Sequence, residues 1–209
     1  QYMQFASNVA AQSSVDPQTK LDIFTSARSA VQSLLAARKD DARLELFAAT
    51  LMGAFGQTPE ALSYLEQALT HSPKKQQLFI QKGFLLIQTG DKEGGLAALK
   101  AAYEADTQFD QPAIFYAAGL YAAGQPAAAD ALLTERFGSP VVDNDQLLQI
   151  FNNLKLYDRA IAVWKLRVSQ SPEDVQKRLG LASTYFAACR TNETIAELQG
   201  IAKLQPQAA

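Results

Sequence analysis

The sequence is poor in the residue types on which catalytic and metal sites depend. Among its 209 residues are one cysteine and one histidine. A single cysteine excludes an internal disulfide and leaves the redox compartment open. Neither Cys189 nor His71 has neighbours in the sequence spaced as metal ligands or as a nucleophilic triad. We therefore expect no metal, no cofactor and no catalytic residue. His71 is expected to have a structural role near the end of a helix.

Positive charge and long apolar runs are also scarce. The formal net charge is −2, and the largest basic cluster is Lys74-Lys75. Nucleic acids and anionic membrane surfaces are bound through cationic faces, so neither is an expected partner. The longest apolar stretch, residues 112–124, is shorter than the roughly 20 residues that span a bilayer. We expect no direct membrane insertion by this chain, and the composition leaves its compartment undetermined.

What the sequence does contain is a repeat, clearest between Gln76 and Phe109. Apolar residues recur there at steps of three and four on both sides of the turn at 89–91, which predicts two helices folded back on each other. Such a hairpin can bury its apolar stripes only against similar neighbours. Segments in the same register begin at intervals of 34, 34, 31 and 34 residues, at Ala42, Gln76, Asp110, Val141 and Val175.

The aligned segments share residue types at fixed positions. Position 8 is small in four copies and position 20 is small in all five, where paired helices must approach closely: Ala49, Gly83, Ala117, Leu148 and Ala182, then Ala61, Gly95, Ala129, Ala160 and Thr194. Position 24 carries a large apolar residue: Leu65, Leu99, Leu133, Trp164 and Leu198. Three copies have proline at position 32, where it ends the second helix.

In these features the chain resembles the tetratricopeptide-repeat (TPR) family over residues 42–208. The resemblance implies an all-α fold, a right-handed solenoid (α-α superhelix) of helical hairpins, with repeats at 42–75, 76–109, 110–140, 141–174 and 175–208. Repeat three is three residues short, and no copy has the family's tryptophan at position 4.

Residues 1–41 are expected to form N-terminal capping helices, equivalent to a partial repeat. A short helix is predicted over residues 1–12, with Met3, Phe5, Val9 and Ala10 inward. Asp16-Pro17 predicts the start of a second helix, which runs to about Arg38. Its predicted inward residues are Leu21, Phe24, Ala27, Val31, Leu34 and Leu35.

The resemblance also implies a binding surface, because the first helices of TPRs line a concave groove with positions 2, 5, 9, 12 and 13. The residues carried over to these positions are Ile80, Phe84, Ile87, Ile114, Tyr121, Asp145, Gln149, Asn152, Asn153 and Phe186. Exposed apolar side chains among amides suit an extended peptide or an amphipathic helix. The alternative is that Phe84 and Phe186 pack between repeats as ordinary core.

The groove lacks one feature of the family members that hold chaperone tails. Those proteins use lysines, an arginine and asparagines to grip a terminal carboxylate. Positions 5 and 9 of the first two repeats are Leu46, Thr50, Ile80 and Phe84, so a carboxylate clamp is not expected.

Two classes of function remain open. The leading hypothesis is a non-enzymatic scaffold that binds a protein or peptide partner. A second resemblance, over residues 113–200, is to the TPR tails of bacterial O-antigen ligases and membrane glycan polymerases. It implies an accessory domain of an envelope enzyme, periplasmic or membrane-associated through other residues, and the first residue, Gln1, favours a fragment of a longer chain. A third idea, hydrolysis by this chain, rests on His71 alone.

Overall fold

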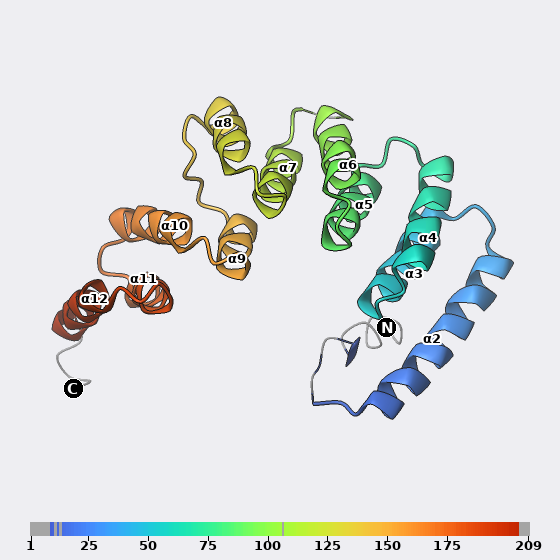
Figure 1. Ribbon diagram of the computed structural model, residues 1–209, viewed down its shortest axis with the longest axis horizontal. Coiled ribbons are helices and arrows are strands. Elements are labelled where there is room, and N and C mark those ends of the chain that lie inside the picture. The colour runs from blue at the N-terminus through green and yellow to red at the C-terminus, as the bar shows by residue number, and fades with distance from the viewer. Residues whose placement is uncertain (1–8, 11, 13, 106, 205–209) are drawn as a thin grey trace. The chain divides into compact units, whose positions relative to one another are not determined.

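The computed structural model describes residues 9–10, 12, 14–105 and 107–204, and the regular structure in these residues is entirely α-helical (Figure 1). This confirms the predicted all-α class. The predicted helix over residues 1–12 lies largely outside the described residues, Met3 and Phe5 included. The helices are α2 (Pro17–Ala37), α3 (Ala42–Ala54), α4 (Thr58–His71), α5 (Gln76–Gln88), α6 (Lys92–Ala105), α7 (Asp110–Ala122), α8 (Pro126–Phe137), α9 (Asp145–Asn153), α10 (Tyr157–Gln170), α11 (Val175–Ala187) and α12 (Thr191–Leu204).

Side-chain caps set where several of these helices begin. Asp16 caps α2 by accepting from Thr19 N at 2.9 Å, and Pro17 takes the first helical position. Asp41 accepts from the Arg43 and Leu44 amides at the start of α3. Asn144 caps α9 in the same way, and for this reason α9 begins at residue 145, four residues after the predicted start of its repeat.

The turns inside the hairpins need a left-handed backbone. Gly56, Gly90 and Gly124 adopt it with φ of 72°, 99° and 83°. Lys155 and Cys189 hold the same position in the last two hairpins, with φ of 57° and 58°. Non-glycine residues adopt this conformation infrequently, so these two turns carry a local backbone cost that the glycine turns avoid.

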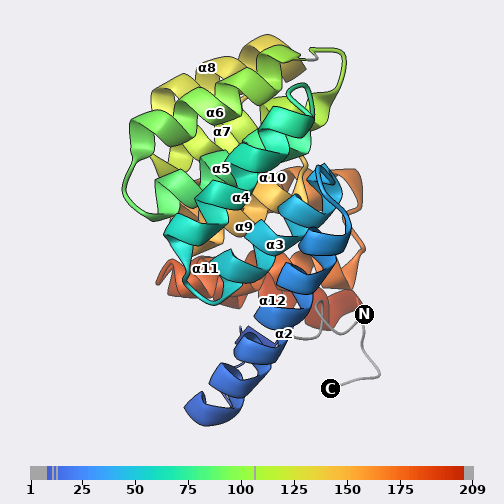
Figure 2. The same ribbon diagram turned by 90° about the vertical axis from the view of Figure 1, so that its right-hand side faces the viewer.

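The chain divides into two compact units, the first ending at Gly119 and the second beginning at Leu120, inside α7. In unit 1, α2 lies alongside α3, as both views show (Figures 1 and 2). Ala27 and Val31 of α2 are buried against α3 residues Ala48, Leu51 and Met52. The prediction that Leu21 and Leu34 face inward was wrong, because α3 covers the face of α2 that carries Ala27 and Val31 and leaves both leucines exposed.

Helices α5 and α6 in unit 1 approach each other closely. A Cβ atom on Gly83 would lie 2.9 Å from the carbonyl oxygen of Gly95, and one on Gly95 would lie 2.6 Å from the carbonyl oxygen of Gly83. Both distances are shorter than real Cβ contacts, so only glycine fits. The predicted close contact between positions 8 and 20 is confirmed in this hairpin.

Unit 2 is joined across three helices by a polar network. The Tyr121 hydroxyl donates to Asp130 Oδ1 of α8 at 2.5 Å, and Arg159 of α10 binds both oxygens of the same carboxylate. The Arg159 guanidinium also lies 4.9 Å from the centre of the Tyr121 ring. Burial raises the pKa of Tyr121, and the hydrogen bond to Asp130 adds to this shift. The phenol therefore stays neutral and acts as a structural donor.

Candidate functional site

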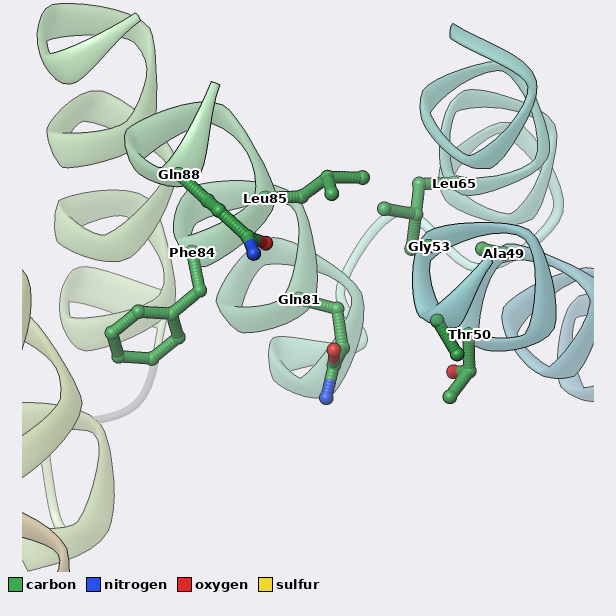
Figure 3. Close-up of a pocket in the computed structure, with 9 residues that line it drawn as sticks. Ala49, Thr50, Gly53, Leu65, Gln81, Phe84, Leu85 and Gln88 are labelled. Carbon is green, nitrogen blue, oxygen red and sulfur yellow. The ribbon is translucent and has the colours of Figure 1, made fainter. Parts of the chain in front are cut away.

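Helices α3 and α5, the first helices of the first two predicted repeats, are separated by an open pocket of about 360 Å³ (Figure 3). Its lining comes from α3, α4 and α5 and consists of Ala49, Thr50, Gly53, Ala54, Leu65, Gln81, Phe84, Leu85 and Gln88. All of these residues belong to unit 1. The volume is within the range of small-molecule ligand pockets.

The floor of the pocket is apolar. Leu65 of α4 is fully buried, and Leu85 of α5 extends toward it across the space between the helices (Figure 3). On the α3 side the space is open because Gly53 has no side chain to fill it. The heavy atom nearest to a Cβ placed there would be Leu85 Cδ1, at 3.9 Å. A residue with a long side chain at this position would fill the pocket.

The rim of the pocket is polar but uncharged. Gln81 and Gln88 are exposed on α5, seven residues and so two turns apart. Each amide offers a donor and an acceptor, the set that pairs with a peptide backbone. The Thr50 hydroxyl of α3 donates a hydrogen bond to the Leu46 carbonyl oxygen at 2.9 Å, so the hydroxyl oxygen can still accept a hydrogen bond from a ligand. The lining contains no ionisable side chain.

Among the groove residues predicted for unit 1, Phe84 lines this pocket. Its ring also packs edge-to-face on Phe115 of α7, with centroids 5.8 Å apart. Phe84 therefore also makes the core contact that the alternative interpretation predicted for it. Ile87 is half-buried against a core cluster that contains Ile80 and Leu99. Ile80 and Ile114 are both buried. Phe84 and Phe115 pack against the cluster that contains Ile80. A partner could not contact either isoleucine without a change in packing, and their groove role stays a prediction.

Tyr121 in unit 2 is likewise inaccessible in this structure. The side chain is buried, packs edge-to-face on Phe151 with centroids 4.9 Å apart, and belongs to the network with Asp130 and Arg159. A partner could reach it only if the packing of α7 on α9 were disrupted.

The remaining predicted residues in unit 2 are on the surface. Asp145, Gln149, Asn152 and Asn153 are exposed on α9. Asp145 accepts a hydrogen bond from Arg167 at 2.6 Å, so its charge is already partly compensated. Phe186 of α11 is 74% exposed, which is unusual for a phenylalanine. Accessibility is compatible with a binding role for these five residues, and that role stays a prediction.

Several pocket residues were missed by the sequence reasoning. Thr50 was placed at groove position 9 of the predicted first repeat but was not counted among the groove residues. Gly53 and Ala54 stand at positions 12 and 13 of the same repeat, so applying all the groove positions there would have found all three. Gln81 and Leu85 stand at positions 6 and 10 of repeat two, outside that set. They line the pocket because they lie on the side of α5 that faces α3.

His71 lies at the end of α4, as expected, and two acids contact its ring. Nδ1 lies 2.9 Å from Glu45 Oε2 and Nε2 lies 3.2 Å from Asp40 Oδ1. The two acids are 26 and 31 residues away in the sequence, so local spacing could not reveal them. Among the residues described, no cluster of three or more His, Cys, Asp or Glu side chains is arranged to hold a metal ion. No helix of the described part is long and apolar enough to cross a membrane.

Comparison with known structures identifies the architecture. A thermophilic TPR protein of Thermus thermophilus, TTC0263, aligns over 88% of this chain and 99% of its own, with 16% identity and a TM-score of 0.56. The chain has the TPR fold. A MamA RS-1 double mutant aligns over 82% of this chain and 97% of its own, with 15% identity and a TM-score of 0.51. No protein-family model matches the sequence, and no curated protein matches it.

Proposed function

We propose that this TPR chain is a protein-interaction scaffold and that unit 1 binds a peptide segment in the pocket between α3 and α5. The observation that carries the proposal is an open pocket with an apolar floor and an uncharged amide rim. Stacked helical repeats commonly present such concave surfaces to partners.

The lining indicates which peptide suits it. Leu65 and Leu85 favour an apolar side chain at the floor, while Gln81 and Gln88 can hydrogen-bond the peptide backbone on either side. Without a lysine or arginine in the lining, the pocket offers no charge for a terminal carboxylate or a phosphate. A neutral internal segment is therefore the favoured ligand.

The decisive experiment fills the pocket at Gly53. Peptides selected from a displayed random library against the wild-type chain would be measured by calorimetry against Gly53→Phe and the matched control Gly53→Ala. We expect the phenylalanine to weaken binding by at least about tenfold, roughly 1.4 kcal/mol, because it occupies the space of the ligand side chain. Alanine should leave affinity unchanged, since its Cβ makes only an ordinary contact. Equal affinity for all three chains would reject the pocket.

The amide rim can be tested separately. Gln81→Ala together with Gln88→Ala should lower the affinity of the same peptides by removing backbone partners. Gln77→Ala is the matched control, because Gln77 is on the same helix but is not part of the lining. An equal loss in the control would show that the effect comes from α5 as a whole.

In unit 2 we propose a second contact surface made of Asp145, Gln149, Asn152, Asn153 and Phe186. The exposure of Phe186 supports it, since exposed aromatic residues are frequent anchors at interfaces. Phe186→Ala should weaken a partner that uses unit 2 by about 2 kcal/mol or more if the ring is an anchor. An unchanged affinity would remove Phe186 from the surface.

A further inference from the structure

His71 joins three segments at one corner of unit 1. It is the last residue of α4, and its two ring nitrogens face Glu45 in the first turn of α3 and Asp40 in the turn between α2 and α3. The side chains differ in exposure: 28% for His71, 5% for Glu45 and 77% for Asp40. One partner is therefore a buried carboxylate and the other a solvated one.

The protonation state of the imidazole decides how many of these contacts can exist. An imidazolium donates from both nitrogens, whereas a neutral ring carries a single N–H. When the ring loses one proton, the remaining N–H stays on the nitrogen whose carboxylate partner would lose most free energy without a donor. That place is the buried Glu45, because a carboxylate without water needs a partner. Asp40 is hydrated by solvent and loses its donor.

We propose that His71 is a pH-dependent clamp: when charged it ties the turn at Asp40 to the end of α4, and when neutral it releases the turn. The backbone of Asp40 supports the proposal, because its φ of 61° is in the left-handed region that residues other than glycine rarely adopt. A contact from outside the turn helps to stabilise this backbone conformation. The residue that supplies the contact is the sole histidine of the sequence.

Other charged groups face the same space. A cavity of about 330 Å³ beside His71 is lined by Arg38 and Lys39 after α2, by Asp40 and Glu45, and by Tyr64 of α4. The two cations favour a neutral ring, and the two carboxylates favour a charged one. The hydrogen bond to Glu45 is the largest influence and raises the pKa of His71 above 6.5; desolvation lowers it, and the charges of Glu45 and Asp40 raise it further.

The direction of the pH effect follows from this shift. A histidine whose pKa is higher in the folded chain stabilises the fold fully below the unfolded pKa. The stabilisation is lost as the pH rises through the folded value. The turn should therefore be held in mildly acidic solution and released above neutral pH.

The test is an NMR titration of the full chain between about pH 5.5 and 8.5, the interval in which histidine changes charge. We expect the His71 ring to titrate with a pKa above 6.5, and the backbone amides of residues 38–41 to shift with the same midpoint. A ring pKa that is not raised, or turn amides that do not follow the ring, would overturn the clamp.

Two variants separate the clamp from a general pH effect. Asp40→Gly keeps a residue suited to the left-handed turn and removes the acceptor, so the amides of residues 38–41 should stop following the ring. His71→Gln should abolish the transition altogether. Persistence of the turn transition in either variant would contradict the proposal. The wild-type and Asp40→Gly titrations decide it even where His71→Gln fails to fold.

Discussion

The hairpin α5–α6 in unit 1 and the hairpin α11–α12 in unit 2 share the same sequence pattern but differ greatly in how well they are packed. Leu99 in α6 and Leu198 in α12 occupy the same repeat position, yet Leu99 is 0% exposed and Leu198 is 46% exposed. Helix α6 buries Gly95, Ala98, Leu99 and Ala102, whereas Thr194 is the residue that α12 buries.

The difference comes from neighbours rather than from residue type. Helix α6 packs on α5 and also faces α7, where Tyr103 stacks on Tyr116 with ring centroids 6.1 Å apart. Helix α12 packs on α11, and its residues Ile195 and Leu198 are exposed. The repeat position specifies which residue type occurs, while burial depends on a second helix on the other side.

The largest contrast should appear when the two leucines are truncated. Leu99→Ala should lower the free energy of unfolding by about 3 kcal/mol, because it empties a fully packed site. Leu198→Ala should change it by no more than about 0.5 kcal/mol, as expected at a partly exposed site. Denaturant unfolding of both variants measures the pair. Similar losses would mean that α12 is covered in solution.

A smaller contrast concerns glycines within the helices. Gly83→Ala should destabilise the chain by about 2 kcal/mol, since the new Cβ would press on the backbone of Gly95, which cannot move aside. Gly200→Ala should instead stabilise it by up to about 1 kcal/mol through helix propensity. The heavy atom nearest to the new Cβ would be Nη1 at the end of the Arg178 side chain, 3.3 Å away. Thermal melting would distinguish the two, and a loss in the second variant would refute an open α12.

The smallest perturbation is isotope exchange, which changes no side chain. Amides of residues 191–204 should exchange faster than those of residues 92–105, because a helix packed on one side opens at lower free energy. Hydrogen-exchange mass spectrometry of the intact chain would compare them. Equal protection would indicate that a partner or a second copy covers α12.

Much of the fold could be predicted because it rests on local signals. Helices α3, α5, α7 and α11 begin at the residues where the repeat frame was set, and Asp16-Pro17 marked the start of α2. Helix α9 departed from the frame because Asn144 supplies the cap that starts it. The division into a cap over residues 1–41 and five repeats stays a prediction.

The site was harder to predict because exposure is a non-local property. Phe84 lines the pocket, whereas Ile80, Ile114 and Tyr121, at predicted groove positions, are buried. Nor could sequence spacing show that His71 meets Glu45 and Asp40. Both outcomes depend on distances between helices, which the sequence of a single repeat does not contain.

The turn between α11 and α12 has a practical consequence. Cys189 occupies it, is exposed, and is the only thiol in the sequence. A maleimide dye or spin label should therefore attach at one place without any substitution. Since that place adjoins α12, fluorescence anisotropy or the electron paramagnetic resonance line shape would report the motion of the last hairpin directly, while unit 1 stayed unlabelled.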